Sequence, residues 1–305
     1  MATSKSDMVS FEKVRPQLLG LAYRMLGSMA DAEDAVQDTF VKWQAKSGDK
    51  IHNPDAWLTT VCTNRCLDLL KSAHKKRVDY VGPWIPEPLQ TETASTPESD
   101  LAQSESLTTA FLLLMERLSP KERAAYLLHE IFGRPYAEVA ATLEINEPAC
   151  RKLVSRAGKH VQSPAARFVP KTPHQDRFLD AFMGALETGS TEVLAGLLSE
   201  NVRFRSDGGG KTAALGRILY GYDEVSKYTT KILSRLWDHA PVTKLEINGV
   251  LGLAIFDGSR FVTAMVPGYA ADGKVEDIFI IRNPDKLQRM THLHQHDLRN
   301  GGLWN

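Results

Sequence analysis

The chain has 305 residues, of which 43% are hydrophobic and 24% are charged, and its 37 Lys and Arg residues balance its 37 Asp and Glu residues. This size and composition predict two or three globular domains with proper hydrophobic cores. The sequence contains no run of about 18 apolar residues and no signal-peptide pattern at its start, which argues against secretion and membrane spanning. We therefore expect a cytoplasmic protein.

The three cysteines match no disulfide or metal-binding pattern. Cys62 and Cys66 lie four residues apart, and Cys150 is far from both. Neither a paired disulfide framework nor the ligand spacing of a metal site has this arrangement. We expect three small core residues, with a redox-sensing pair of Cys62 and Cys66 as the alternative.

Residues 28–44 predict an amphipathic helix with an acidic outer face. At about 100° per residue, apolar side chains fall on one side, and Asp31, Asp34 and Asp38 fall on the opposite side. Acidic residues early in a helix also interact favourably with its dipole, so a merely solvated face is one interpretation. The alternative is a docking surface for a basic partner.

Residues 53–77 predict a second helix, with Asn53 as its N-cap and Pro54 in its first turn. One side of this helix is apolar, and a polar line on another side leads into a basic end. The polar line and the basic end comprise Thr60, Asn64, Lys71, Lys75, Lys76 and Arg77. A basic end is favoured by the helix dipole alone. A nucleic-acid surface is the alternative, because Thr and Asn hydrogen-bond to bases while cations contact phosphates.

Two Pro-rich segments divide the chain. Residues 84–105 are acidic and contain no Lys or Arg, and within them residues 85–100 show no helical or alternating period. This composition predicts a linker. Residues 163–176 contain three prolines and predict a second junction.

Residues 118–161 predict three short helices. Ser119 and Glu122 form a capping-box pattern at the start of the first helix. The second helix is expected to begin near Pro135, and Asn146 is expected to cap the third after a short corner. A tight corner before the last of three compact helices is typical of a helix-turn-helix.

The last of these helices separates small apolar residues from basic and hydroxylic ones. Its outer face carries Arg151, Lys152, Ser155, Arg156 and Lys159. A solvated face would usually include acidic residues, and none occurs in this helix after Glu147. Because Arg reads guanine edges in the major groove and Lys neutralises phosphates, we interpret this face as DNA-binding.

The last third of the chain predicts an α+β domain. Two helical stretches are expected at about residues 174–187 and 191–199. Apolar runs typical of strands follow them, several joined by Asn-Gly or Asp-Gly turns. These runs are residues 202–206, 242–247, 250–256, 260–266 and 275–281.

The helical segments resemble regions 2 and 4 of bacterial extracytoplasmic-function (ECF) sigma factors of the sigma-70 family. Their occurrence in this order, separated by a linker, is more specific than either helix alone. The stretches that carry the resemblance are residues 23–43, 56–71 and 118–159. It implies a multidomain fold with two all-α sigma domains, at residues 8–79 (region 2) and 105–163 (region 4), joined by an acidic linker at 80–104.

The resemblance also implies a role for each surface. The acidic side chains that would dock on core RNA polymerase are Asp31, Asp34 and Asp38. The side chains that would open and read the promoter −10 element are Trp57, Thr60, Asn64, Lys71, Lys75, Lys76 and Arg77. The −35 element would be read by Arg151, Lys152, Ser155, Arg156 and Lys159. The last helix ends in RAGK, where family members commonly carry a longer basic run.

Three further motifs resemble markers of a sigma-factor subgroup with a C-terminal SnoaL-like domain. They are WIPEPL at 84–89, DGGGK at 207–211 and NPDKL at 283–287. This resemblance implies an α+β cone like that of nuclear transport factor 2 at residues 172–290, which restrains or tunes the sigma domains in cis. The implied regulatory contacts are Trp84, Pro86, Glu87, Pro88, Asp207, Gly208, Gly209, Gly210 and Lys211.

Two other functions remain open. An ordinary helix-turn-helix regulator would bind DNA without polymerase, but it leaves the acidic helix and the polar strip unexplained. SnoaL-like and ketosteroid-isomerase-like relatives are often enzymes, so a pocket enzyme or small-ligand sensor with accessory DNA-binding helices is the second alternative. Asp207, Arg205 and Lys211 would supply the charge near such a pocket.

We expect a monomeric transcription initiation factor that is not an enzyme and uses no metal or cofactor. Its expected partners are core RNA polymerase, double-stranded promoter DNA, the melted −10 strand and its own C-terminal domain, and an unknown small ligand stays open. No membrane contact is expected. The tail at 291–305 holds His292, His294 and His296 beside Asp297, and we expect it to be mobile rather than metal-binding.

Overall fold

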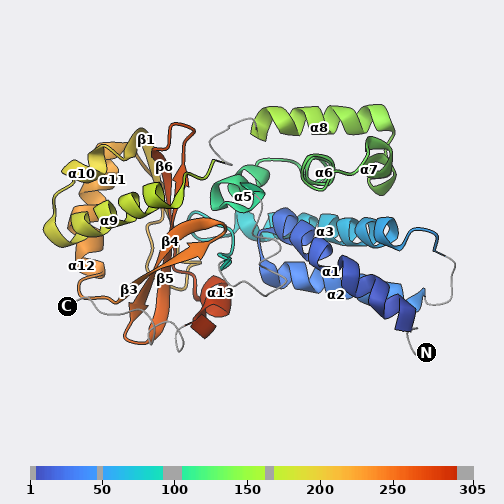
Figure 1. The fold of residues 1–305 in the computed structure, drawn as a ribbon, viewed down its shortest axis with the longest axis horizontal. Coiled ribbons are helices and arrows are strands. Elements are labelled where there is room, and N and C mark those ends of the chain that lie inside the picture. Colours follow the sequence, from blue (N-terminus) through green and yellow to red (C-terminus); the bar gives the residue numbers. More distant parts are fainter. Residues whose placement is uncertain (1–4, 47–50, 92–104, 162–167, 294–305) are drawn as a thin grey trace. The chain divides into compact units, whose positions relative to one another are not determined.

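The computed structural model describes residues 5–46, 51–91, 105–161 and 168–293 (Figure 1). The chain divides into two compact units. The first comprises Met1–Asp79, Ser95–Leu101 and Leu112–Ser163, and the second comprises Tyr80–Ala94, Ala102–Phe111 and Pro164–Asn305. Within the described residues the first unit is helical, and the second contains a sheet covered by helices.

Three long helices form the first part of the first unit: α1 (Lys5–Leu26), α2 (Met29–Ala45) and α3 (Pro54–Val78). Each of them packs against the other two. The chain turns after α1 at Gly27, whose φ of 68° is a conformation that glycine adopts without steric cost. Ser28 caps α2 by accepting a hydrogen bond from the Asp31 amide (3.3 Å), and Asn53 caps α3 as the sequence predicts.

The three helices enclose a core of large apolar side chains. Tyr23, Met25, Met29 and Leu58 are all fully buried there. Burial of a large apolar side chain stabilises a fold by about 1.5–3 kcal/mol, so this core holds the three helices together.

The second part of the first unit contains the helix-turn-helix. Its elements are the part of α5 (Thr109–Met115) from Leu112 onward, α6 (Pro120–Tyr126), the π-helical turn η2 (Leu127–Ile131), α7 (Tyr136–Thr142) and α8 (Glu147–Val161). The predicted capping box is present, because Ser119 and Glu122 bond to each other's backbone amides. Glu144 has a φ of 53° in the corner before α8, and the Asn146 side chain accepts from the Ala149 amide (2.9 Å) to cap that helix.

The second unit is built on a six-stranded sheet in the order β2-β1-β6-β5-β4-β3. The strands are β1 (Leu198–Asp207), β2 (Leu219–Tyr220), β3 (Val242–Ile247), β4 (Val250–Asp257), β5 (Arg260–Tyr269) and β6 (Val275–Ile281). Only β1 and β6 pair in parallel among these strands, and the other neighbours are antiparallel. All five predicted strand runs fall on these elements, and the predicted α+β class is confirmed.

Helices cover this sheet, with α9 against β4 and α11 against β1 (Figure 1). They are α9 (Thr172–Thr188), α10 (Glu192–Ala195), α11 (Tyr222–Tyr228), the π-helical turn η4 (Thr229–Leu233) and α12 (Ser234–Leu236). Phe178 and Phe182 of α9 are fully buried and lie near Tyr269 and Trp237. After β6, α13 (Pro284–Leu287) and η5 (Gln288–Leu293) end the described chain. The predicted helix at 191–199 is shorter than expected, because β1 already begins at Leu198.

The described residues bear on the cysteines, on membrane spans and on possible metal ligands. Cys62, Cys66 and Cys150 are free and buried, as expected for core residues. The hydrogen bond with Cys62 and burial raise the pKa of the Cys66 thiol, which disfavours the reactive thiolate. No helix among the described residues is long and apolar enough to cross a membrane, and no group of potential metal ligands occurs among them. His294, His296 and Asp297 lie outside the described residues, and the side chain of His292 is not described.

Candidate nucleic-acid interface

Helix α8 presents a continuous basic face to solvent. Its inner side buries Cys150, Val154, Ala157 and Val161. Its exposed side carries all five predicted −35 residues, Arg151, Lys152, Ser155, Arg156 and Lys159. All five side chains therefore reach solvent from one face of the helix, as a helix that enters a major groove requires.

Arg151 is held in place by two neighbours that the sequence did not reveal as part of the surface. Its guanidinium forms an ion pair with Glu147 one turn earlier and lies 4.2 Å from the ring centroid of Tyr136. The other neighbour of Tyr136 is His129, stacked at 3.7 Å between centroids. Tyr136 is the first residue of α7, and its aromatic character at the start of the helix before the corner was the available signal.

The acidic face of α2 is open at one end and paired at the other. Asp31 and Asp34 are exposed, whereas Asp38 forms an ion pair with Arg65 of α3 at 2.6 Å. Beyond Asp38, Val41 is exposed at 57%, which adds an apolar contact to the same helix. This face of α2 thus combines exposed carboxylates with one exposed apolar side chain, a combination suited to a basic protein partner.

The predicted −10 strip on α3 is only partly accessible. Trp57 is half-buried and packs on Trp43 with ring centroids 5.5 Å apart. Asn64 is half-buried, and Lys71 is exposed and bonds to Asp68 at 2.8 Å, which lowers the pKa of that carboxyl. Lys75, Lys76 and Arg77 continue the helix, but their side chains lie outside what the structure describes.

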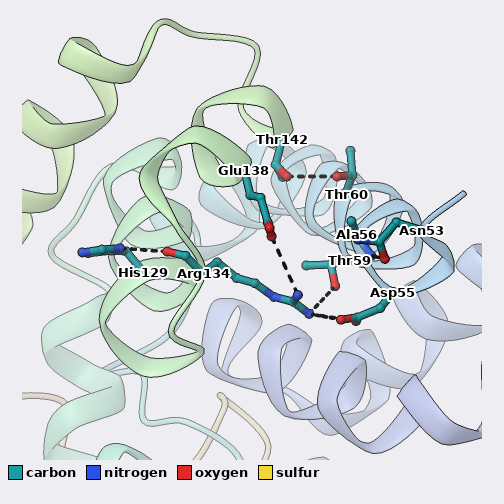
Figure 2. A network of polar contacts seen from close by, with 9 residues as sticks. All are labelled: Asn53, Asp55, Ala56, Thr59, Thr60, His129, Arg134, Glu138 and Thr142. Atoms are coloured by element: carbon teal, nitrogen blue, oxygen red, sulfur yellow. Dashed lines mark hydrogen bonds and ion pairs between the residues drawn. The ribbon is translucent and has the colours of Figure 1, made fainter.

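Thr60, the first hydroxyl of this strip, is bound by the helix-turn-helix. Its Oγ1 lies 2.9 Å from Oγ1 of Thr142 at the end of α7. Figure 2 shows the polar network to which this contact belongs. At its centre Arg134, in the loop before α7, donates from Nη2 to both carboxylate oxygens of Asp55 at 2.7 Å. Arg134 also lies 3.8 Å from Glu138 and reaches the hydroxyl of Thr59 at 3.5 Å.

A second contact joins the same two parts of the first unit. Arg123 of α6 is buried and donates from Nη1 to the Met25 carbonyl in the last turn of α1 and to Glu116 (2.7 Å). Carbonyls in the last turn of a helix lack an intrahelical donor, so Arg123 supplies one. Arg24 of α1 lies 5.7 Å from the ring centroid of Phe132. Burial lowers the pKa of both Arg24 and Arg123 to about 10.

In the second unit, the three marker motifs meet at one buried carboxylate. Asp207 is fully buried and accepts hydrogen bonds from the Tyr80 hydroxyl (2.6 Å), the Ile85 amide (2.9 Å), the Gly209 amide (3.0 Å) and Lys286 Nζ (2.7 Å). Burial and the nearby Asp207 raise the pKa of Tyr80, which keeps its hydroxyl a donor. Buried charges are stable only when paired and hydrogen-bonded, and this carboxylate meets both conditions.

The segment 80–91 is held along its length by the rest of the second unit. Lys286 lies 4.5 Å from the ring centroid of Trp84, and the buried Glu87 forms an ion pair with Arg289 at 3.4 Å. Pro86 and Pro88 are buried on either side of Glu87. Further on, Asn248 exchanges two hydrogen bonds with Leu89. The predicted linker therefore begins as an ordered strap of the second unit, and its remainder, residues 92–104, lies outside the described residues.

The glycines of DGGGK are required by close packing. A Cβ on Gly208 would lie 2.2 Å from the Thr212 carbonyl oxygen, and one on Gly209 would lie 2.2 Å from the side-chain nitrogen Nδ2 of Asn283. Gly209 and Gly210 also have φ of 61° and 71°, in the left-handed region. Lys211 pairs with Asp285 of α13 at 2.5 Å. The motif thus joins β1 to the NPDKL turn, and Asn283 in turn donates to Tyr80 (3.0 Å).

A helix-turn-helix with a basic outer face, together with a three-helix bundle that has an acidic face on α2, defines a DNA-binding protein with a second docking surface. Comparison with known proteins agrees with this class. The family description "Sigma-70 region 2" matches residues 11–76, and "Sigma-70, region 4" matches residues 108–161.

Full-length relatives come from Mycobacterium tuberculosis. The chain is 36% identical over 297 residues to the ECF RNA polymerase sigma factor SigJ, covering 92% of this chain and 93% of the relative. It is 31% identical over 295 residues to the probable ECF sigma factor SigI, covering 93% and 96%. The crystal structure of SigJ superposes with a TM-score of 0.73 at 33% identity, covering 92% of this chain and 98% of that one.

The chain therefore belongs to the ECF RNA polymerase sigma factors of the sigma-70 family, and it carries a C-terminal α+β domain as SigJ does. Members of this family are transcription initiation factors that bind core RNA polymerase and promoter DNA. From here on, region 2 denotes α1 to α3 and region 4 denotes α5 to α8.

Proposed function

We propose that α8 of this sigma factor reads the promoter −35 element and α3 reads the −10 element while α2 holds core RNA polymerase. The single observation that carries this proposal is the outer face of α8, where five exposed basic or hydroxylic side chains occur together on one helix. Positive charge on a helix of a helix-turn-helix favours DNA through phosphate contacts, and its Arg residues provide base readout. The protein would act in the cytoplasm, where polymerase and promoters are.

The polymerase contact is supported by the open end of α2. Asp31 and Asp34 have no ion-pair partner among the described residues and are exposed. Asp38 is already paired with Arg65, so we assign it a weaker role in polymerase binding than Asp31 and Asp34. Arg65 would then orient Asp38 rather than contact the polymerase itself.

The C-terminal domain would modulate initiation in cis by controlling the linker. Residues 80–91 connect region 2 to region 4 along the chain, and Asp207, Lys286 and Asn248 hold them by the contacts described above. As long as these bonds persist, the start of the linker cannot follow the polymerase surface. Releasing it would require breaking a buried ion pair, which is a costly step.

The geometry of Asp207 disfavours the enzyme alternative. Four donors surround its two oxygens, and the carboxylate is fully buried. A general acid or base needs access to a substrate proton, and this carboxylate is occupied instead. Lys211 differs from Asp207, because it is exposed and its ammonium pairs with the exposed Asp285.

A transcription assay with purified core polymerase tests the proposed function. The template would be a promoter recovered from a randomised pool by transcription with this protein and core polymerase. We expect run-off transcript only when protein and polymerase are both present, and loss of transcript when either promoter element is scrambled. Transcription that ignores a scrambled −35 element would contradict the role of α8. A gel shift that requires no −10 element and gains nothing from polymerase would favour the ordinary regulator.

A further inference from the structure

The two proposed DNA-reading surfaces differ in accessibility within the first unit. All five side chains of the α8 face are exposed, whereas Thr60 of α3 is engaged by Thr142 of α7. The contact comes from region 4 itself, and the C-terminal domain contributes no residue to the network in Figure 2. A base approaching Thr60 would therefore have to displace region 4 first.

Polar bonds hold this contact around a loosely packed and partly apolar gap, as expected of an interface that opens. A cavity of about 130 Å³ lies between α3 and α7, lined by Ala56, Thr60, Glu138 and Thr142 among others. Such a volume accommodates several water molecules, whose access weakens the contact. The groups that bond α3 to α7 and to the loop before it are guanidinium, carboxylate and hydroxyl groups. The buried contact of Arg123 with the Met25 carbonyl joins the two parts at a separate place. Interfaces of this kind between parts of one chain resemble transient protein interfaces.

Arg134 is the residue that ties the loop before α7 to α3 beside the −10 strip. It spans from the loop before α7 to Asp55 in the first turn of α3, and its side chain is only 17% exposed. Both bonds to Asp55 come from the one nitrogen Nη2, and each is a charge-assisted hydrogen bond to the carboxylate. His129 supports the loop, because its Nδ1 lies 2.8 Å from the Arg134 carbonyl oxygen.

We propose that Arg134 and Asp55 form a latch that closes region 4 over the −10 strip while leaving the −35 face of α8 open. The proposal rests on the assigned role of Thr60 in reading the −10 element. In the closed form the protein can approach a −35 duplex but not a melted −10 strand. Any ligand that binds only the open form, such as that strand or core polymerase, shifts the population toward opening.

The direction in which Arg134→Ala changes the affinity for DNA distinguishes the latch from a simple effect of charge. Arg134→Ala removes a positive charge, which by itself weakens binding to DNA. A broken latch instead strengthens binding of the free protein to single-stranded −10 DNA, by about fivefold for an ion pair of this exposure. Affinity for the −35 duplex should not increase.

The matched variants keep the charge under control. Arg134→Asp combined with Asp55→Arg preserves the net charge and restores the pair in reverse, so strand binding should return close to the original value. Arg15→Ala removes the same charge from an exposed ion pair with Glu12 on α1, and neither residue belongs to the network in Figure 2. This control should show no gain in strand binding.

The measurement uses the full-length protein without polymerase. Fluorescein-labelled strand and duplex from the selected promoter are titrated separately and followed by anisotropy. In parallel, a dye pair on Gln37→Cys and His160→Cys, both exposed positions, reports the separation of α2 from α8. The expected result is a larger separation and tighter strand binding in Arg134→Ala. Unchanged separation and unchanged strand affinity would overturn the latch. Larger separation without tighter strand binding would overturn the masking of Thr60 and its −10 role, leaving the assignment of α8 intact.

A cross-link tests the closed form without relying on Arg134. The Thr60 and Thr142 hydroxyl oxygens are 2.9 Å apart, so Thr60→Cys and Thr142→Cys place two thiols close enough for a disulfide after a small shift. The three native cysteines are buried and should not interfere. The oxidised protein should melt the promoter with polymerase at least about tenfold less than the same protein after reduction. Equal melting in both states would overturn the proposal.

Discussion

Helices α8 and α3 carry the two proposed DNA-reading surfaces of the same unit, yet only one is open. The five predicted side chains of α8 all reach solvent, and Cys150, Val154, Ala157 and Val161 on its other side are buried. On α3, by contrast, Trp57 packs on Trp43 and Thr60 bonds to Thr142. The sequence of a helix thus determines the chemistry of its faces, whereas the packing of neighbouring elements determines which of these faces is accessible.

The difference in accessibility follows from the way polar and apolar residues are arranged on each helix. The polar residues of α8 follow one another at helical spacing with no apolar interruption, so nothing in the unit gains by covering them. The polar line of α3 lies beside Ala56 and Thr59, which border the cavity facing α7. A partly apolar border attracts a covering element, because burying it is favourable.

The largest expected effect is a loss of stability in the second unit, away from α8 and α3. It tests whether the accessibility of the α8 face depends on that unit. Lys286→Ala leaves the fully buried Asp207 without its cation, which should lower the free energy of unfolding of the second unit by about 3–5 kcal/mol. Calorimetry would measure the loss. Duplex binding by α8 should persist, and a parallel loss of −35 affinity would show that α8 is not an independent surface.

A change on the open helix should weaken DNA binding directly. Arg151→Ala should cost about 1–3 kcal/mol in −35 binding, if it contacts a guanine edge, and should relax specificity at one base pair. Binding to a panel of single-base variants of the −35 element measures both effects. Binding to core polymerase should be unchanged, and uniform weakening across the panel would reassign Arg151 to a phosphate contact.

A change on α2 should give the opposite pattern. Asp34→Lys with Asp38→Lys places like charges against a basic partner and next to Arg65, and should weaken polymerase binding by at least about tenfold. Co-sedimentation with core polymerase at low salt provides the measurement. The control is free −35 duplex binding, which should not fall. Normal polymerase binding by this variant would remove α2 from the docking surface.

The smallest effect sharpens the description of the open face. Tyr136→Leu removes the ring against the Arg151 guanidinium and should weaken −35 binding by about 0.5–1 kcal/mol. Tyr136→Phe keeps the ring and should behave like the unchanged protein. In an Arg151→Ala background the Leu substitution should add nothing, and an additive effect in that double variant would mean that Tyr136 acts elsewhere.

Much of the fold could be predicted because its signals are local. The caps at Asn53, Ser119 and Asn146 and the alternating strands after residue 240 depend on neighbouring residues, and they appear where expected. Helix α11 and the turn η4 were missed, because they lie in a stretch of mixed polar and apolar residues without a cap signal.

The candidate site was only partly predictable for the same reason. The exposed face of α8 follows from helical periodicity alone. The pairing of Arg134 with Asp55, and the meeting of Tyr80, Asp207 and Lys286, join residues 79 or more positions apart, so no local pattern predicts them. Marker motifs indicated that residues 84–89, 207–211 and 283–287 matter together, but the structure was needed to show that they enclose one buried carboxylate.

The most direct test of the central claim compares the two surfaces in one protein, with and without core polymerase. The unmodified protein is titrated against a −35 duplex and against a −10 single strand from the same promoter. An open α8 and a covered α3 predict that the free protein binds the duplex, and that the strand is bound only once polymerase is present. Equal affinity for the −10 strand in the presence and absence of polymerase would contradict the account.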